Sequence, residues 1–343
     1  MKTFIPEVIG KFKVPRGRQS RFHAPLLVTA INPSLAADLF SRFGPSRVMV
    51  PIGTSPDFLG IIESPHYEQG SGSKATLINE FSDRQVTGQV SKLTAIPDIN
   101  EEIFEWIDLL ESVKLCNSKF IFVELGAGYG RWAARAFRAA VKHGLSPENI
   151  TLVTVEPESD HFSWIGDHFK LNEIAPGQDF RVCAALSNWT GEGDFFVARP
   201  GENGDTEPNE WYGQALAKSD WEGAITKRVA VVTLSNVLEC LGDEIIDLID
   251  MDIQGEDALV LQEAEIHLAR VKRVHVGTNS VEDEREIRKF FTRLGWLCIR
   301  DWQTVNINAT EFGPIQFLDG VQTWINSELV NLNQGTGTKD QLK

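Results

Sequence analysis

The stretch "FVELGAGYGRW", Phe122 to Trp132, decides the fold. Three glycines at every second position, Gly126, Gly128 and Gly130, follow an apolar run that ends in the acid Glu124. Glycine lets the backbone turn sharply and lets another molecule approach closely. The loop also lies between a β-rich run and a helical pattern, at the strand end where open α/β sheets bind their ligands. We therefore expect an α/β protein with a ligand at this loop.

The order of strand and helix patterns from Ile121 onward supports this fold class. Short β-rich runs alternate with helical patterns, which predicts a parallel sheet with crossover helices. Two further runs with no helix between them predict an antiparallel hairpin at one edge. The five expected parallel strands cover residues 119–125, 149–157, 180–186, 244–253 and 271–278, and the hairpin strands cover residues 295–302 and 312–320.

The composition of the chain divides it into regions. Residues 1–90 contain clusters of Pro, Gly and Ser with weak periodicity, and we expect an N-terminal accessory region there. The α/β domain is expected over residues 91–330. A polar insertion near residues 199–222 is long enough to form an active-site lid, and residues 331–343 are expected to form a flexible tail.

Charge and cysteine usage exclude several classes of protein. The net charge of −15 argues against a nucleic-acid partner, although the first 25 residues hold six Lys or Arg against one acid and suggest a solvated or interface arm. No apolar run has membrane-spanning length, so we expect no membrane insertion and a cytoplasmic location. The four cysteines are scattered, with no pair at metal-ligand spacing: Cys116, Cys183, Cys240 and Cys298. Three of them lie in or beside apolar runs and are interpreted as small core residues in a reducing compartment.

Two ligand classes compete for the glycine loop. A dinucleotide requires the spacing G-x-G-x-x-G, with the pyrophosphate at the helix N-terminus. Here the spacing is G-x-G-x-G, and Arg131 stands at the position of the third fingerprint glycine. This mismatch disfavours a nicotinamide-dependent oxidoreductase.

S-adenosylmethionine fits the same stretch better. It carries no phosphate, and the acid Glu124 suits its ammonium and cationic region. Backbone N–H groups of Gly126, Ala127, Gly128 and Gly130 suit its carboxylate. A second acid, Glu156 at the end of the second strand, suits the two ribose hydroxyls, because one carboxylate accepts both. The alternative is a tight turn with two solvated acids.

Candidates for catalysis follow the fourth and fifth strands. Asp250 and Asp252 should face opposite ways, and Asp252, nearer the strand end, is the better candidate to orient a hydroxyl, take its proton or contact the cofactor. His275 is a candidate base or hydrogen-bond donor, and Asn279 a candidate substrate-positioning residue. Each has a structural alternative: a helix cap for Asp252, a satisfied core histidine for His275 and a turn cap for Asn279.

Aromatic and histidine pairs complete the candidates. Trp211 and Tyr212, in the polar insertion, are expected to stack on adenine or on a sugar, or to anchor the loop. His161 and His168 lie seven residues apart on one expected helix, but no third ligand is evident. We interpret them as surface or packing residues and expect no metal.

Taken together, these motifs resemble the FkbM family of S-adenosylmethionine-dependent methyltransferases. The resemblance runs from about Asn100 to Asn326 and includes "NEEIFEWIDLL", "VELGAGYGRW", "VEPESDHFSWIGDHFKLNEI", "AALSNWTGEGDFF", "TLSNVL", "IDMDIQGEDALVLQEA" and "VHVGTNS". Asp250 and Gln254 stand where related sequences usually have Lys and Glu, and Asn279 where they often have His.

The resemblance implies a class I methyltransferase fold with strand order 3-2-1-4-5-7-6. It implies O-methylation, with S-adenosylmethionine as cofactor, of a hydroxyl on a saccharide, polysaccharide or secondary metabolite. By motif, Glu124, Gly126, Gly128 and Glu156 match cofactor positions, and Asp252 matches the fourth-strand acid. The altered fourth-strand motif leaves a second hypothesis open, a methyltransferase-like binding module without catalysis.

Overall fold

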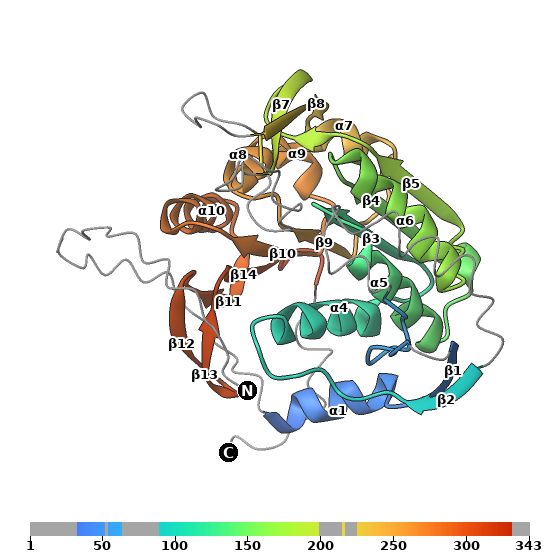
Figure 1. Ribbon diagram of the computed structural model, residues 1–343. Helices are drawn as coiled ribbons and strands as arrows, with labels where there is room; N and C mark the ends of the chain where they lie inside the picture. The colour runs from blue at the N-terminus through green and yellow to red at the C-terminus, as the bar shows by residue number, and fades with distance from the viewer. Residues whose placement is uncertain (1–32, 52–53, 64–88, 199–214, 217–224, 331–343) are drawn as a thin grey trace, which may run out of the picture.

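The computed structural model describes residues 33–51, 54–63, 89–198, 215–216 and 225–330. Its centre is a seven-stranded sheet that runs across the middle of the molecule (Figure 1). In spatial order the strands are β11 (Leu297–Trp302), β14 (Gly320–Ile325), β10 (Arg273–Thr278), β9 (Leu248–Met251), β3 (Phe120–Leu125), β4 (Ile150–Val155) and β5 (Gln178–Val182).

The strand order is 3-2-1-4-5-7-6 when these seven strands are numbered along the chain, as expected for a class I methyltransferase fold. Neighbours from β5 to β10 pair in parallel, whereas β14 is antiparallel to both β10 and β11. The α/β class and the antiparallel edge are thereby confirmed.

The predicted position of one edge strand was wrong. Residues 312–320 do not enter the main sheet, because β13 (Gly313–Phe317) pairs with β12 (Asn306–Thr310) in a separate hairpin. The seventh strand is instead β14, which begins at Gly320 and is buried throughout. Its polar residues Gln322 and Thr323 are buried with partners, so β14 lacks the uniformly apolar pattern of a central strand.

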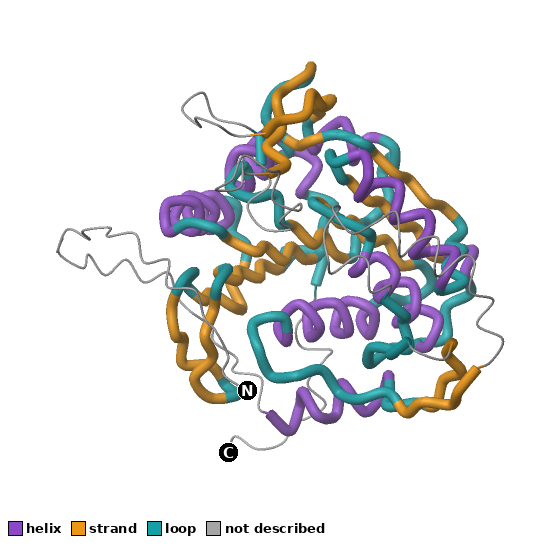
Figure 2. Tube along the Cα trace, in the orientation of Figure 1, coloured by secondary structure: helices purple, strands orange, loops and turns teal. Residues whose placement is uncertain are grey.

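Helices cover both faces of the sheet (Figure 2). One face carries α4 (Ile103–Leu115), α5 (Arg131–Lys142) and α6 (Ser159–Leu171), and the other carries α7 (Leu234–Glu239), α8 (Asp257–Glu263), α9 (Glu265–Leu268) and α10 (Val281–Arg293). Alternate residues of β3 serve the two layers, because Phe122 packs with α4 and α5 while Val123 packs with α7 and α8. Burial on both faces is typical of a parallel sheet with crossover helices.

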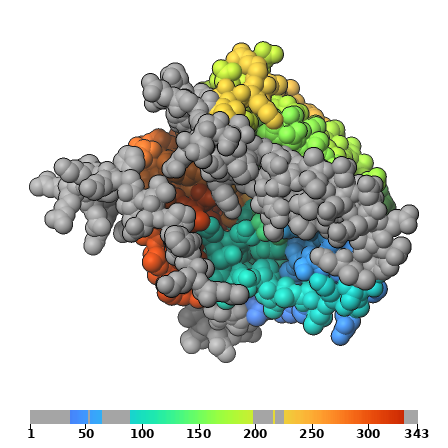
Figure 3. Space-filling model, viewed as in Figure 1, coloured from blue at the N-terminus to red at the C-terminus, as the bar shows by residue number. Residues whose placement is uncertain are grey.

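The described part of the N-terminal region packs on the same core. Helix α1 (Pro33–Phe43) and the segment around Phe58 join the hydrophobic cluster of α4 and α5, and β1 (Arg47–Pro51) pairs with β2 (Gln89–Leu93). In the space-filling view, the blue and cyan N-terminal residues and the red C-terminal strands lie on either side of the teal surface that includes α4 (Figure 3). Glu63 of this region bonds Arg131, the first residue of α5, at 2.9 Å, so the region adjoins the strand-end edge at which α5 begins.

A small second sheet stands beside the main one. It contains β6 (Ala185–Leu186), β8 (Ile225–Val232) and β7 (Gly191–Ala198), in that order. The expected third strand, residues 180–186, is thus divided between β5 and β6. The short helix η2 (Pro147–Asn149) precedes β4. The aromatic pair Trp211 and Tyr212 lies outside the described residues.

The cysteine interpretation is only partly correct. Cys116 is buried and Cys298 is half-buried, but Cys183 and Cys240 are exposed, so the prediction of three core cysteines was wrong for at least one of them. Apolar neighbours in sequence do not decide the side to which a residue at a strand or helix end points. In the described part of the chain, no helix combines the length and the apolarity needed to cross a bilayer.

Candidate functional site

The glycine loop is a tight turn between β3 and α5. Gly126, Gly128 and Gly130 have φ angles of 82°, 54° and 73°, a region that favours glycine. The N–H groups of Gly126 and Ala127 both donate to the Val155 carbonyl, at 3.0 and 2.9 Å. The loop is therefore anchored to the end of β4, where Glu156 follows.

Glycine at position 126 is also required by space. A Cβ atom there would lie 2.0 Å from the carbonyl oxygen of Asp252, in the loop after β9. Gly130 differs, because it is the N-cap of α5 and a Cβ atom there would meet Ile165 and Phe169 of α6 at 3.1 Å. Gly130 lines neither of the two cavities described below, so the geometry gives it a packing role, and its assignment to the cofactor stays a prediction.

Glu156 joins the second strand end to the glycine loop. One carboxylate oxygen accepts the N–H of Gly128 at 2.8 Å, and the other accepts the N–H of Glu158 at 2.8 Å. Glu158 in turn accepts two N–H groups at the start of α6. The Glu156 side chain is therefore fixed before any ligand arrives, and it keeps spare lone pairs that face the cavity.

Glu124 has a role that the sequence did not predict. Its two oxygens accept the N–H groups of Trp132 and Ala133, at 3.0 and 2.9 Å, and so cap the N-terminus of α5. Burial, together with the negative charge of Asp250, raises the pKa of Glu124 to about 8. Glu124 also lines the larger cavity, so a contact with the cofactor remains a prediction.

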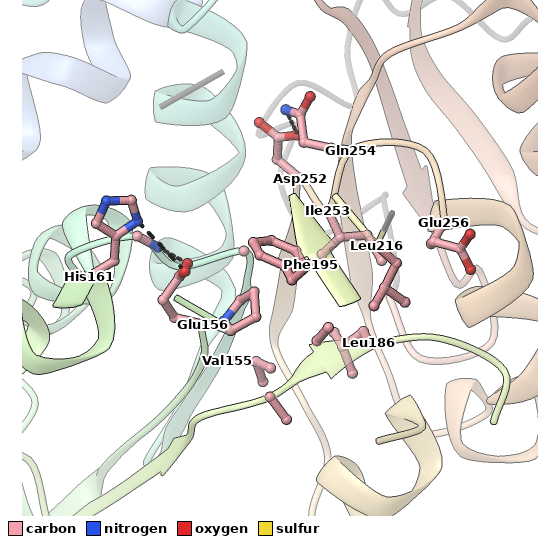
Figure 4. A pocket seen from close by; sticks show the side chains of 15 residues that line it. Val155, Glu156, His161, Leu186, Phe195, Leu216, Asp252, Ile253, Gln254 and Glu256 are labelled. Atoms are coloured by element: carbon pink, nitrogen blue, oxygen red, sulfur yellow. Dashed lines mark hydrogen bonds and ion pairs between the residues drawn. The ribbon is translucent and has the colours of Figure 1, made fainter. Parts of the chain in front are cut away.

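A small cavity of about 100 Å³ lies between Glu156 and the second sheet. Apolar side chains form most of its walls, and Figure 4 shows Glu156 near one end with Phe195 and Leu216 across from it. The apolar residues are Val155, Pro157, Ala184, Ala185, Leu186, Phe195, Leu216 and Ile253. An apolar slot with one fixed carboxylate suits a flat heteroaromatic ring attached to a sugar.

A larger cavity of about 510 Å³ adjoins the first. The two share Gly126, Gly128, Asp252 and Gln254, so together they form one cleft along the carboxyl ends of the strands. The lining of the larger cavity is strongly acidic. Its acids are Glu63, Glu101, Glu102, Glu105, Glu124, Asp250, Asp252 and Asp319.

Asp252 is open to both cavities, and Gln254 donates to it at 2.9 Å (Figure 4). Although its side chain is exposed to the cleft, desolvation by the surrounding protein, followed by the charges of Asp319 and Asp250, raises its pKa to about 7. Asp257, rather than Asp252, accepts the N–H groups of Ile253 and Gly255 in the loop before α8. In the first turn of α8, the N–H of Ala258 donates to Asp283 of α10 at 3.3 Å. Asp252 is thus a carboxyl group that changes protonation near neutral pH, at the junction of the two cavities.

A row of polar side chains crosses the sheet at one level. Strand pairing places Glu124 beside both Thr154 and Asp250, and His275 beside both Asp250 and Thr323. Thr323 is in turn beside Arg300 of β11. We call these six buried residues the polar row: Thr154, Glu124, Asp250, His275, Thr323 and Arg300.

Helix α4 lies against the polar row and bonds to it through two acids. Asp108 lies 2.8 Å from Nδ1 of His275, and Glu105 hydrogen-bonds Asp250. Burial, and then the charge of Asp250, raises the pKa of Glu105 well above its usual value. The protonated Glu105 carboxyl group therefore donates a hydrogen bond to Asp250. His275 and Asp250 also line the larger cavity, which places the polar row in the cleft.

The remaining candidates take less central positions. Asn279 lines neither cavity, and its side-chain amide donates to Asp319 at 3.4 Å. His161 and His168 are both buried, so a surface role is wrong for them. His161 lies 3.8 Å from Glu156, and burial lowers the pKa of His168 to about 4. In the part of the chain that the structure describes, no cluster of three or more His, Cys, Asp or Glu is arranged to hold a metal.

Fold and cleft together define a class I methyltransferase. The sequence model of a protein family, described as the methyltransferase FkbM domain, matches residues 124–297, more than half of the chain. The chain belongs to the FkbM methyltransferase family.

Individual proteins also resemble this chain, at low sequence identity. A protein of Jannaschia sp. (strain CCS1), named "Putative methyltransferase", is 26% identical over 231 residues, which are 64% of this chain and 77% of that protein. Among solved structures, precorrin-6Y C5,15-methyltransferase from Geobacter metallireducens is 10% identical over 67% of this chain and 89% of that chain, with a TM-score of 0.38. An O-methyltransferase from Bacillus cereus in complex with SAH is 10% identical over 77% of this chain and 92% of that chain, with a TM-score of 0.37.

Several residues of the cleft were missed from sequence. Phe195 and Leu216 meet across the small cavity because their backbones form an isolated bridge at the edge of β7. Glu105 and Asp108 lie on α4, ahead of the glycine motif. The available signal was Asp108 itself, an acid four residues after Phe104 on an apolar helix face.

Proposed function

We propose that this protein is an S-adenosylmethionine-dependent O-methyltransferase whose acceptor is a hydroxyl of a saccharide, polysaccharide or secondary metabolite. The observation that carries the proposal is the fixed position of Glu156, bonded to Gly128 at the base of an apolar cavity. Membership in the methyltransferase family supports the reaction type.

The residues present fit this cofactor. Glu156 would hold the ribose hydroxyls, and the apolar walls that include Phe195 and Leu216 would hold the adenine. The acids of the larger cavity would face the ammonium and sulfonium groups, which are both cationic. When bound, S-adenosylmethionine supplies an electrophilic methyl group, and its transfer leaves a neutral thioether.

The larger cavity is the proposed acceptor site. Its volume of about 510 Å³ lies in the range of small-molecule sites, and it adjoins the small cavity at Asp252. Asp252 and His275 are the candidate groups to take the hydroxyl proton there. Glu63, from the N-terminal region, also lines this cavity, which supports the proposal that residues 1–90 influence acceptor choice.

The insertion beside β7 is the proposed lid. Its described residues Ala215 and Leu216 add to the edge of β7, where the Phe196 N–H donates to the Ala215 carbonyl at 2.8 Å. Leu216 reaches the small cavity. A closing lid excludes water and aligns the reacting groups, and alignment alone supplies about 7–11 kcal/mol of barrier reduction.

The experiment combines binding and turnover. Calorimetric titration with S-adenosylmethionine should show binding to the wild type. Glu156→Ala should abolish measurable binding, and Glu156→Gln, which keeps one acceptor oxygen, should weaken it about 10- to 100-fold, because hydrogen bonds to charged groups contribute about 1.5–3 kcal/mol. Glu239→Gln, at the exposed end of α7, is the matched control and should bind as the wild type does.

Turnover is measured as S-adenosylhomocysteine formed with a panel of saccharides and other hydroxyl acceptors. Equal cofactor affinity in wild type and Glu156→Ala would remove the ribose assignment. Cofactor binding without product from any acceptor would instead support the hypothesis of a methyltransferase-like binding module.

A further inference from the structure

Asp108 is an ionised side chain at the centre of a buried network. It is fully buried on α4, and groups from three strands donate to its two oxygens. Oδ1 accepts the guanidinium groups of Arg273, at 2.9 Å, and Arg300. Oδ2 accepts the hydroxyl of Thr323 at 2.5 Å and faces Nδ1 of His275 at 2.8 Å.

The charges of this network balance without a proton on Asp108. Arg273 also pairs with Glu111 at 2.9 Å, so two guanidinium groups face two carboxylates. Burial alone would raise the pKa of Asp108, but Arg300, His275 and Arg273 together hold that pKa well below its usual range. Asp108 therefore only accepts hydrogen bonds, and the nitrogen that faces it must carry hydrogen.

This requirement fixes the chemistry of the His275 ring. Nδ1 carries the hydrogen and donates it to Asp108, so in the neutral ring Nε2 holds a free lone pair. Because Nδ1 faces Asp108, Nε2 lies on the other side of the ring, and His275 is one of the residues that line the larger cavity. The acids that interact with the ring are Asp108 from α4 and Asp250 and Asp252 from β9 and its end. Four further charged or titratable groups bond to these acids or to one another: Glu105, Glu111, Arg273 and Arg300.

We propose that Asp108 is a positioning residue that holds His275 in the Nδ1–H tautomer, with Nε2 ready to accept the proton of an acceptor hydroxyl in the larger cavity. The inference rests on the proposed function and assigns the base within it. The hydroxyl oxygen would form the new O–C bond to the methyl group as the C–S bond breaks, and the C–S electron pair would stay on sulfur, which leaves as a neutral thioether. The O–H bond would break with its electron pair left on oxygen, and the proton would form an N–H bond at Nε2. The resulting imidazolium lies between the carboxylates of Asp108 and Asp250, which stabilise its charge.

A purely structural role for Asp108 makes a different prediction. Asp108 would then only tie α4 to β10, β11 and β14, and the tautomer of His275 would be indifferent to it. Loss of Asp108 would lower stability but leave the ring unchanged. The protonation pattern of the ring therefore distinguishes the two roles.

The test is nitrogen NMR of the full-length protein labelled with ¹⁵N-histidine, with the His275 signals assigned by their loss in His275→Gln. In the wild type, we expect the neutral His275 ring to show a pyrrole-like Nδ1 and a pyridine-like Nε2. In Asp108→Asn the amide oxygen stays with the two arginines and the amide N–H₂ faces the ring, so the opposite tautomer, with hydrogen on Nε2, should dominate.

Asp247→Asn is the matched control. Asp247 is another buried carboxylate that pairs with a lysine, and its replacement should lower stability without changing the His275 signals. A pyridine-like Nδ1 in the wild type overturns the proposal, even if Asp108→Asn does not fold. An unchanged tautomer in a folded Asp108→Asn protein also overturns it.

A second readout uses turnover. Asp108→Asn should keep the cofactor affinity of the wild type within a few-fold and lower kcat about 10²–10⁴-fold, the usual contribution of a general base. If the wild type binds no S-adenosylmethionine, the proposed function fails, whereas the NMR result still decides the role of Asp108. Wild-type kcat in a folded Asp108→Asn protein would sink the assignment of His275 as base.

Discussion

The guanidinium of Arg135 on α5 donates to the carboxylate of Asp57, 78 positions earlier in the chain, at 2.9 Å. It also bonds Glu63 at 3.0 Å and lies 4.4 Å from the ring centroids of both Trp106 and Trp132. Arg135 is 2% exposed. One buried cation therefore ties the N-terminal segment to the helix that follows the glycine loop.

Replacement of this cation should be costly. Arg135→Met should lower the free energy of unfolding by about 3 kcal/mol or more, because Asp57 would keep a largely buried charge without its arginine partner and Glu63 would be left with Arg131 alone. Urea denaturation measures the change. Arg42→Met, which removes an exposed i,i+4 pair with Asp38, is the control and should change stability by less than about 0.5 kcal/mol. Similar losses in both variants would contradict the structural role of Arg135.

Gly126→Ala should destabilise the protein more than another glycine substitution at positive φ. Gly126 and Gly144 both have positive φ, so alanine at either position adds backbone strain of about 1 kcal/mol or more. Only at Gly126 does the new Cβ also meet a backbone atom, the Asp252 carbonyl at 2.0 Å, because nothing lies within 4 Å at Gly144. Thermal unfolding should therefore show a clearly larger drop in Tm for Gly126→Ala. Equal drops would mean that the loop and the β9 end are not in contact.

Asp252→Asn should separate binding from turnover. The amide is nearly isosteric, so affinity for S-adenosylmethionine should stay within a few-fold of the wild type. Turnover should fall, and the pH dependence that comes from a carboxyl group with a pKa of about 7 should disappear from the rate profile. Initial rates from pH 5 to 9 in both proteins test this. A profile unchanged near pH 7 would show that Asp252 does not govern the rate.

Because of Glu124, the free energy of unfolding should fall as the pH rises. Its folded pKa of about 8 lies above the ordinary value of 4.5, so between these two values the folded state keeps a proton that the unfolded state has released. The free energy of unfolding should then fall across this window, by up to about 1.4 kcal/mol per pH unit from this group. Urea denaturation at pH 5 to 8 should give a shallower slope for Glu124→Gln. The control Glu239→Gln should keep the wild-type slope.

Much of the fold followed from local pattern. The glycine loop, the acid after β4 and the alternation of strands and helices are each contained in a few consecutive residues, so the α/β class and the position of Glu156 were accessible. The strand order was implied by the family resemblance instead. The ends of β4 and the glycine loop meet as expected, through the bonds from Gly126 and Ala127 to Val155.

What could not be predicted depends on residues that are distant in sequence. Asp108 pairs with His275 and Arg300 over separations of 167 and 192 positions, and no motif around Asp108 in the sequence indicates these partners. Burial of Gln322 and Thr323 depends on the same long-range contacts, and β14 was overlooked for that reason. The hydrogen bond between Glu105 on α4 and Asp250 on β9 is another such contact.

The position of α4 limits how far the chain can be shortened without loss of the buried network. A fragment limited to residues 124–297, the part shared with the family, would omit α4 and β14. Arg273 would then keep its buried place with neither Asp108 nor Glu111 as counter-ion, and His275 would have no acceptor for its Nδ1–H. A shortened version for expression or crystallisation should therefore extend from before Ile103 to beyond Ile325, because the buried network around His275 includes residues on both flanks of the segment that matches the family.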